Sequence, residues 1–440
     1  MEELGRNTIH KLGKRVREAY GDGTGHVEEA DLKLLQDYRL SYRDDIAAVF
    51  KILYEVSKKN DKHCIVTYRL KRINSIIEKL KRFPTAALEN FVDIAGCRCI
   101  TEDERSVYKI VKKIKHDPRL KVGLIKDYIQ TPQPEGYRSV HLYVSLADST
   151  KKLVEIQVRT RKQHDWATLV EISDVIVKGA RLKEYGQPAD LLEFHRILSV
   201  PEEELTDTLR NFYFDILNKY NYINLMHEVF LQNISLRYQW INTFSSGTKD
   251  FYLIESGAKK QTKIESYQTF HDAENAYFER FRQNPNANLI LTQIPNVTFE
   301  QLSTAYSNYV LSTHNFTNDC INRCMKEIKN ALWDRDLDRF ETTLDTYLNA
   351  VAHQMIRMNQ EIYTLNHSDK LQQNPKQREW VKDLERQMAQ LMSRRDKLRS
   401  LYKETKLYEE GWLTRIRFEI ISRKLANKYD DLVKASVKRR

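Results

Sequence analysis

The sequence predicts an α+β protein in which a five-stranded mixed β-sheet flanked by helices is followed by a small α/β unit and a helical or coiled-coil C-terminal region. Three patterns predict this class: apolar residues at helical spacing near the N-terminus, short alternating runs in the middle, and a heptad-like seam near the C-terminus. We therefore expect N-terminal helices over 1–60, the sheet domain over 61–200, a helical plus small α/β accessory domain over 201–320, and a helical hairpin or coiled coil with a basic tail over 321–440.

The boundaries of the first two domains follow from periodicity. Residues 8–60 are predicted to form helices, because their apolar residues recur at helical spacing, at Leu32, Leu34, Leu35, Tyr38, Ile46, Val49, Phe50 and Leu53. Alternating runs then predict strands at Ile65–Leu70, Ile94–Ile100, Val122–Ile129, Val140–Leu146 and Leu153–Val158. Helical patterns at 71–82, 103–116 and 161–180 lie between or after these runs, which favours helices packed on a mixed sheet.

The rest of the chain alternates between helical stretches and one more α/β segment. That segment has strands near 251–255, 261–267 and 287–294 and a helix near 271–283, and a turn at 247–250 precedes it. A polar linker at 366–375 separates it from a seam of apolar residues that Arg395 interrupts: Val381, Leu384, Met388, Leu391, Leu398 and Tyr402. This seam predicts the helical hairpin or coiled coil, and the chain ends in the basic tail 434–440.

Composition sets broad limits on function. The 440 residues are 41% hydrophobic, enough to bury a core, and no apolar run is long enough for a transmembrane helix or a secretory signal, so we expect a cytoplasmic protein with no membrane partner. Five cysteines without C-x-x-C spacing favour core or surface thiols over a zinc site. The net charge of +11 suits polyanions, although a helix-rich protein with solvated Lys and Arg has the same charge.

Two segments carry candidate phosphate and metal ligands. A helix over 71–82 would place Lys71, Ser75 and Lys79 on one face, which suits a triphosphate, although a solvated lysine face gives the same pattern. Asp93 is a candidate Mg²⁺ ligand, and Arg98 follows it in the next predicted strand. Strict alternation places Asp93 and Arg98 on opposite faces, so a bend or bulge near Asp93 is required if both serve one site.

Two more strands have polar faces, which an antiparallel sheet with one wet face would also give. Their polar residues are Glu155, Gln157 and Arg159 in one strand and Ser139, His141 and Tyr143 in the other. The preceding loop, 127–137, contains two prolines and a glycine and ends in Tyr137, an aromatic suited to stacking on a base. The segment 163–167, which includes His164, opens the helix that carries Glu171.

In this order and spacing, the chain resembles the RelA/SpoT synthetase family. The motifs are R-x-K…S…K, DIAGxR, DYIxxP…GYRSxH, EIQVRT and QHxWAxxxE, over about 100 residues from Arg69 to Glu171. A weaker resemblance to the longer members that have a synthetase alone continues to about residue 316, and 320–440 resembles nothing known to us. The resemblance implies a nucleotidyltransferase-like fold and transfer of the β,γ-pyrophosphate of ATP to a ribose 3′-hydroxyl.

The resemblance also assigns roles to residues. Arg69 and Arg98 would sandwich the adenine, and Lys71 and Lys79 would hold the phosphates. Asp93 and Glu155 would bind Mg²⁺, and Glu155 would accept the proton of the attacking hydroxyl. Tyr137 would stack on the acceptor base, and the remaining site residues would be Ser75, Gln133, Glu135, His141, Gln157, Arg159 and His164.

The acceptor loop departs from the family pattern P-K-x-N-G-Y. Gln133 replaces the lysine that meets the acceptor's 5′-phosphates, and Glu135 replaces the asparagine that helps to recognise guanine. Two acceptors therefore stay open: GDP or GTP, giving a (p)ppGpp-type alarmone, and the 3′-terminal adenosine of tRNA, as in toxic members of the family. A carboxylate can still accept hydrogen bonds from the N1–H and N2–H edge of guanine.

The alternatives extend to physiology and to catalysis itself. Only 68 residues precede Arg69, too few for the family's hydrolase domain, so we expect an unopposed synthetase acting as a stress enzyme or a toxin, with antiphage or toxin–antitoxin roles. The C-terminal region would then bind a regulatory protein or ligand or form a homo-oligomer. An inactive synthetase fold that binds RNA or protein is the remaining hypothesis, but a pure binding module has no need of the two metal carboxylates.

Overall fold

We describe a computed structural model of the chain. The structure describes residues 4–21, 27–148, 152–180, 182, 186–200, 204–233, 249–257, 260–284, 287–294, 309–366, 375–405, 416, 418–427 and 429. The chain divides into two compact units, Met1–Glu202 with Asn233–Leu311, and Glu203–Gln232 with Ser312–Arg440. Half of the turn predicted at 247–250, nearly all of the linker at 366–375 and the whole basic tail lie outside the described residues.

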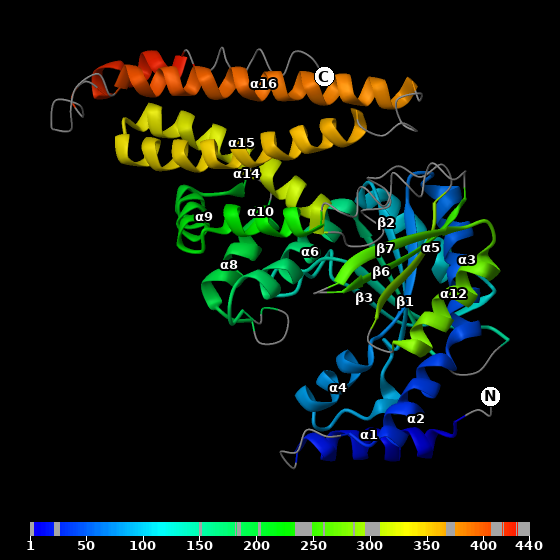
Figure 1. The fold of residues 1–440 in the computed structure, drawn as a ribbon. Coiled ribbons are helices and arrows are strands. Elements are labelled where there is room, and N and C mark those ends of the chain that lie inside the picture. Colours follow the sequence, from blue (N-terminus) through cyan, green and yellow to red (C-terminus); the bar gives the residue numbers. More distant parts are fainter. Residues whose placement is uncertain are drawn as a thin grey trace. The chain divides into compact units, whose positions relative to one another are not determined.

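The first unit contains one β-sheet with helices around it (Figure 1). Its strands are β1 (Ile65–Leu70), β2 (Ala95–Thr101), β3 (Leu120–Asp127), β4 (Val140–Leu146), β5 (Val154–Thr160), β6 (Phe251–Gly257), β7 (Lys260–Tyr267) and β8 (Asn288–Gln293). Its helices are α1 (Arg6–Gly21), α2 (Glu29–Leu40), α3 (Arg43–Asn60), α4 (Ile73–Arg82), the 3₁₀ turn η1 (Leu88–Asn90), α5 (Glu104–Lys115), α6 (Arg161–Ile176), α8 (Ala189–Leu198) and α12 (Phe270–Gln283).

The sheet has eight strands in the order β3-β4-β5-β2-β1-β8-β6-β7. The β2–β5 pair is parallel and the other pairs are antiparallel, so the prediction of a mixed sheet flanked by helices is confirmed. The predicted number of five strands is wrong. Strand β8 pairs with β1 at Thr67↔Thr292 and Tyr68↔Leu291, so the segment expected to form a separate α/β unit extends the same sheet.

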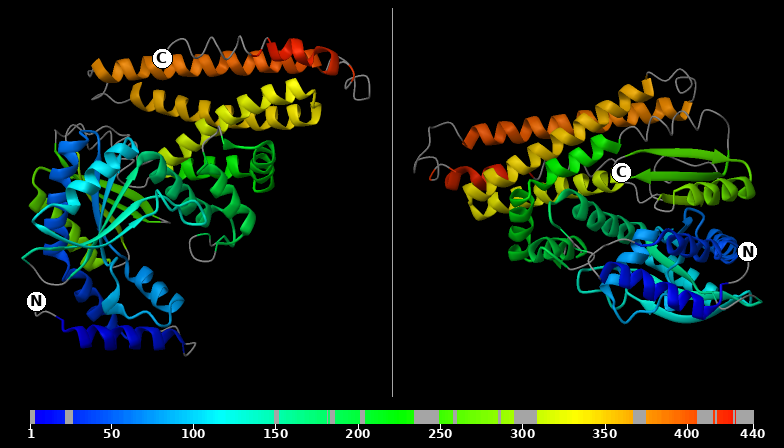
Figure 2. Two further views of the ribbon diagram at one scale, coloured as in Figure 1. Left: turned by 180° about the vertical axis from the view of Figure 1, so that it is seen from behind. Right: turned by 60° about the horizontal axis from the view of Figure 1, so that its bottom comes forward.

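One face of the sheet is apolar and carries the core of the first unit. Strands β4 and β5 turn Val140, Leu142, Val154, Ile156 and Val158 toward this face, and all are buried. Helices α3 and α5 pack against it, and α12 covers its extension over β6 and β8 (Figure 2). Because alternate side chains point to opposite faces of a strand, the polar residues between these positions must lie on the other face.

The cysteines are buried and free. Cys97 and Cys99 alternate with the polar residues of β2 and belong to the same hydrophobic core as the apolar side chains of β4 and β5. Cys320 and Cys324 lie one helical turn apart in the second unit, with sulfur atoms 4.0 Å from each other. The structure thus places the two pairs in separate cores.

Helix bounds near the site follow from local sequence. Helix α4 buries Ile73, Ile76, Ile77 and Leu80 at spacings of three and four, which makes one apolar stripe. It begins at Ile73, so Lys71 precedes the helix instead of lying on it as predicted. Helix α6 begins with a capping box. The Thr160 hydroxyl accepts a hydrogen bond from the Gln163 backbone N–H, and the Gln163 side-chain oxygen accepts one from the Thr160 backbone N–H.

The second unit is helical. It contains α9 (Asp207–Lys219), α10 (Tyr222–Asn233), α14 (Tyr309–Asp334), α15 (Leu337–Asn366) and α16 (Pro375–Thr405), and residues 418–427 are also helical. Helices α15 and α16 pack along each other, as the predicted hairpin requires, and Leu384 and Leu398 of the seam are buried. Among the described residues, no helix has the length and apolar character needed to cross a bilayer.

The shared sheet makes a prediction for stability. Leu291 of β8 is fully buried beside β1, so Leu291→Ala should cost about 2–5 kcal/mol and should loosen β1 as well as β6–β8. Hydrogen exchange should therefore speed up in peptides from residues 65–70. The matched control is Leu398→Ala in the second unit, which should leave exchange in β1 unchanged. Unchanged exchange in β1 of Leu291→Ala would mean that the small α/β segment folds independently.

Candidate active site

Strand register brings the polar residues of four strands together. In the parallel β2–β5 pair, Gly96 lies beside Glu155 and Arg98 beside Gln157. The neighbouring antiparallel pairs extend these into two rows across one face, Arg69–Gly96–Glu155–Tyr143 and Thr67–Arg98–Gln157–His141. Adjacent side chains in each row come from strands next to each other, so the rows form a continuous polar surface.

A cavity of about 300 Å³ opens over these rows. It contains seven of the site residues expected from the sequence: Arg69, Lys71, Asp93, Arg98, His141, Glu155 and Gln157. Thr67, Gly96, Cys97 and Ile290 complete the lining. The cavity lies within the first unit. Its polar groups include both cations and carboxylates, as a site for a metal-bound polyphosphate requires.

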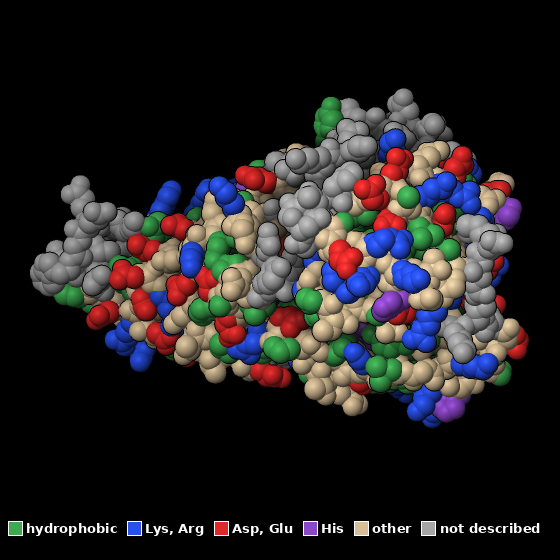
Figure 3. Space-filling model, turned by 90° about the horizontal axis from the view of Figure 1, so that it is seen from below, with side chains coloured by type: hydrophobic (Ala, Val, Ile, Leu, Met, Phe, Trp, Pro, Cys, Tyr) green, Lys and Arg blue, Asp and Glu red, His purple; other side chains and the backbone are tan. Residues whose placement is uncertain are grey.

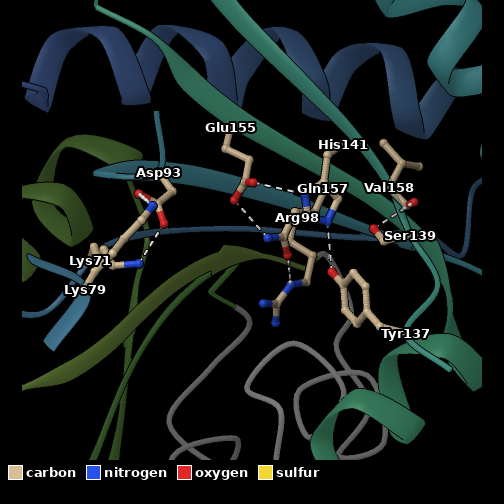
Figure 4. Close-up of polar contacts among 10 residues, drawn as sticks. All are labelled: Lys71, Lys79, Asp93, Arg98, Tyr137, Ser139, His141, Glu155, Gln157 and Val158. Carbon is tan, nitrogen blue, oxygen red and sulfur yellow. Dashed lines mark hydrogen bonds and ion pairs between the residues drawn. The ribbon is translucent and has the colours of Figure 1, made fainter. Parts of the chain in front are cut away.

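Asp93 sits just before β2 and is held by two lysines (Figure 4). Lys71 Nζ lies 2.7 Å from Asp93 Oδ2, and Lys79 Nζ lies 2.9 Å from Oδ1. Burial alone would raise the pKa of the Asp93 carboxyl, but the two ammonium groups outweigh it, so its pKa lies below the ordinary value. Since Asp93 precedes the strand, with bends at residues 92 and 94, it reaches the same cavity as Arg98.

Glu155 is fixed by its neighbours in the sheet. His141 Nδ1 lies 3.0 Å from Glu155 Oε1, and Gln157 Nε2 donates to Oε2 at 2.9 Å. Burial raises the pKa of the Glu155 carboxyl, but the contact with His141 and the hydrogen bond from Gln157 outweigh this effect. The pKa therefore lies below its ordinary value. The Tyr137 hydroxyl contacts His141 Nε2 at 2.9 Å, which extends the chain of polar contacts toward the loop (Figure 4).

The arginines of the site are desolvated. Arg98 Nε donates to Gln157 Oε1 at 3.3 Å, and burial, together with Arg159 and Arg69, lowers the pKa of Arg98 to about 9. Arg159 is also buried and reaches His164 Nδ1 at 2.7 Å. A bound polyanion would relieve the mutual repulsion of these cations, so the cavity is electrostatically suited to phosphate.

The loop before β4 is a closed turn. Gln133 N–H donates to the Tyr137 carbonyl at 3.2 Å, and Gly136 N–H donates to the Gln133 carbonyl at 2.8 Å. Gly136 has a φ of +100°, and a Cβ there would lie 2.7 Å from Ser199 Oγ, so the position requires glycine. Tyr137 packs near Trp166, at 6.4 Å between ring centroids. The turn thus presents an aromatic ring beside His141.

Seven of the residues named from the sequence do not line the cavity: Ser75, Lys79, Gln133, Glu135, Tyr137, Arg159 and His164. Four others line it without having been named as site residues: Thr67, Gly96, Cys97 and Ile290. Thr67 shares the face of Arg69 by strand alternation and was detectable on that ground. Ile290 lies on β8, more than 200 residues from β1, and no local pattern links the two strands.

A divalent cation is compatible with this donor set. Asp93 and Glu155 face one cavity, and the charge of Asp93 acts to raise the pKa of Glu155. The described residues contain no cluster of three or more metal-ligating side chains, so an all-protein cage is not formed in this part of the chain. Mg²⁺ typically takes one or two carboxylates and completes its shell with water and phosphate oxygens, so two carboxylates fit it.

 The mixed sheet thus carries a cation-rich cavity with two carboxylates, a combination that suits a metal-bound polyphosphate. The family described as "Region found in RelA / SpoT proteins" matches residues 68–175, and nine of the eleven residues that line the cavity lie in this segment. The other two are Thr67, which directly precedes the matched range, and Ile290 of β8. Over residues 68–175 the chain matches this family, so the resemblance seen in the sequence is confirmed.

Individual relatives agree with this assignment. The segment is 37% identical over 111 residues to the GTP pyrophosphokinase YwaC of Bacillus subtilis, covering 23% of this chain and 53% of that protein. It is 34% identical over 128 residues to the GTP pyrophosphokinase YjbM of the same organism, covering 27% of this chain and 60% of the relative. The chain thus spans little more than half the length of these relatives.

A solved structure of the small alarmone synthetase 2 from Bacillus subtilis also matches this chain. It has a TM-score of 0.31 and 29% sequence identity, and the match covers 37% of this chain and 88% of that one.

The contacts of Glu155 make a prediction for its titration. In His141→Leu, the partner that lowers the pKa of Glu155 is lost while burial remains, so the pKa should move upward. The shift can be read from the carboxyl ¹³C resonance of Glu155 during a pH titration. Tyr137→Phe is the matched control, because it removes only the hydroxyl contact to the far side of His141. A Glu155 pKa that stays fixed in His141→Leu would contradict the assigned contact.

Proposed function

We propose that this protein is an ATP-dependent pyrophosphokinase that transfers the β,γ-pyrophosphate of ATP to the 3′-hydroxyl of GDP or GTP, forming a (p)ppGpp-type alarmone in the cytoplasm. The observation that carries the proposal is the pairing of two carboxylates, Asp93 and Glu155, with the cations Arg69, Lys71 and Arg98 around one cavity. The family of residues 68–175 and the names of the relatives support the same reaction.

The ATP side of the site consists of cations at the end of β1 and in β2. Arg69 and Arg98 would hold the adenine between their guanidinium planes, which stack well on flat rings. Lys71 and Lys79 would exchange their contacts with Asp93 for contacts with the phosphates, since both ammonium groups already converge on one point. Mg²⁺ bound by Asp93 and Glu155 would neutralise charge on the transferred phosphates.

Glu155 would also receive the proton of the attacking hydroxyl. Its lowered pKa keeps the carboxylate ionised at neutral pH, and the contacts to His141 and Gln157 fix its direction. A positioned base typically contributes about 10²–10⁴-fold to a rate.

The acceptor side supports guanine through Tyr137 and Glu135. Tyr137 offers a ring for stacking beside the cavity, and the Glu135 carboxylate can accept from the N1–H and N2–H edge of guanine. Glu135 is itself outside the cavity lining, so this contact would need the nucleotide to extend toward the loop.

One observation favours a second acceptor, the 3′ end of tRNA. Gln133 is uncharged and cannot neutralise a 5′-diphosphate, but the 3′-terminal adenosine of tRNA has no 5′-diphosphate that would need a cation. The surface gives it less support. On the face shown in Figure 3, Lys and Arg side chains are interspersed with Asp and Glu. Several cations of α1 are paired, including Arg15 with Asp31 at 2.6 Å and Lys14 with Glu18 at 3.7 Å.

The test is transfer of label from γ-³²P-ATP with Mg²⁺ to GDP, GTP, ADP or bulk tRNA, each offered separately to the full chain. We expect label in GDP or GTP and none in ADP. Label in tRNA alone would replace the proposal with the tRNA alternative, and no transfer to any acceptor would favour the binding-module hypothesis. The full chain is required because residues 288–293 supply a strand of the same sheet.

Glu155→Gln is the internal control for this assay. It keeps the size of the side chain but removes the base and a metal ligand, so transfer should fall below detection while ATP binding stays measurable by calorimetry. Full transfer activity in Glu155→Gln would remove Glu155 from the reaction.

A further inference from the structure

Arg39, near the end of α2, is fully buried although it carries a charge. Its Nε donates to the Lys71 carbonyl at 2.7 Å, and its NH1 donates to Gln36 Oε1. The Lys71 carbonyl lies between β1 and α4, just before the N-cap residue Arg72, so helix α4 cannot use it. Arg39 therefore satisfies a backbone acceptor at the position that carries a phosphate-facing lysine.

The backbone of Lys71 is held from both sides. Its N–H donates to the Ile94 carbonyl at 2.8 Å, next to Asp93, and its carbonyl accepts from Arg39. The direction in which the Lys71 side chain leaves the backbone is therefore set by these two bonds. Since Lys71 Nζ meets Asp93 at 2.7 Å, the Arg39 contact helps to set the geometry of the cation–carboxylate group itself.

Burial of Arg39 is costly for stability. Among the described residues, no carboxylate lies within ion-pair distance of its guanidinium, so no opposite charge offsets its desolvation in that part of the chain. Burial lowers the pKa of Arg39 to about 9, so the group is still a cation at neutral pH. Its guanidinium lies over the ring of Phe281 in α12, 4.1 Å from the centroid, which provides a partial replacement for water.

Helix α12 also contacts the end of β1 directly. The Tyr277 hydroxyl accepts a hydrogen bond from Leu70 N–H at 2.9 Å, and its ring stacks on Phe281 with centroids 5.7 Å apart. Gln36 Nε2 donates to the Phe281 carbonyl at 2.8 Å. Two consecutive residues of the chain, Leu70 and Lys71, are thus fixed by groups from α12 and α2 that do not line the cavity.

We propose that Arg39 and Tyr277 are positioning residues for the ATP side of the site, holding the end of β1 so that Arg69 and Lys71 point at the phosphates and the base. This inference rests on the proposed use of the cavity for ATP. The same inference gives two roles to residues 249–294. Helix α12 holds the end of β1 through Tyr277, and strands β6, β7 and β8 extend the sheet.

Arg39→Met tests the inference, with Arg43→Met as the matched control. Arg43 begins the next helix and also lies over an α12 ring, Phe278, at 4.9 Å, but it bonds Glu274 and Asn275 and no residue of the site. Arg39→Met should weaken binding of a non-hydrolysable ATP analogue at least about tenfold, because a charge-assisted hydrogen bond contributes on that scale. The control should bind the analogue as the wild type does.

A purely structural role would give a different kinetic signature. Loss of folded protein lowers kcat and leaves both Michaelis constants unchanged, whereas misplacement of Lys71 raises the KM for ATP and leaves the acceptor KM unchanged. Equal ATP affinity in Arg39→Met and the wild type would overturn the inference. The binding measurement needs no turnover, so a wild type that binds the analogue but transfers nothing would contradict the proposed function alone.

Tyr277→Phe keeps the test decisive if Arg39→Met does not fold. It removes one oxygen, the acceptor of the Leu70 N–H bond, and should also weaken binding of the analogue. Tyr68→Phe is its control: Tyr68 is buried in β1 against Tyr277, and its hydroxyl makes no hydrogen bond within the described part of the chain. A positioning role for Tyr277 would be contradicted if both tyrosine variants lost the same affinity, or if neither variant lost any.

Discussion

The parallel pairing of β2 with β5 is the constraint on which the site depends. Its register places Gly96 beside Glu155 and Arg98 beside Gln157, and the antiparallel neighbours β1 and β4 add their polar residues to the same face. A slip of one residue would turn every one of these side chains into the apolar core under α3 and α5. The buried valines and isoleucine of β5 therefore fix the position of the polar face and also stabilise the sheet.

The site holds several charged groups in a partly desolvated environment, which is unfavourable until a polyanionic ligand binds. Arg98 and Arg159 are desolvated, and Asp93 is surrounded by two ammonium groups that a polyphosphate would attract in its place. Glu155 is held separately by His141, so the two carboxylates are available for different tasks. The supports behind this face, including Arg39 and the Tyr277 hydroxyl, come from α2 and α12, far from the site in sequence.

Local patterns predicted what depends on local structure. Strand alternation placed Arg98, Glu155, Gln157 and His141 on polar faces, and the structure puts them in one cavity. Lys71 was expected on a helix, but the helix begins only at Ile73, because the apolar stripe of α4 starts there. Pairing between β1 and β8 joins segments more than 200 residues apart, so neither the eight-stranded sheet nor the part of Ile290 in the cavity followed from periodicity.

The central claim is that one cavity holds ATP through the cations that now surround Asp93. A crystal structure of the full chain with a non-hydrolysable ATP analogue and Mg²⁺ tests this directly. The account predicts the adenine between Arg69 and Arg98, with Lys71 and Lys79 moved from Asp93 to the phosphates. A nucleotide bound elsewhere, or a triphosphate in the cavity with both lysines still on Asp93, would contradict it.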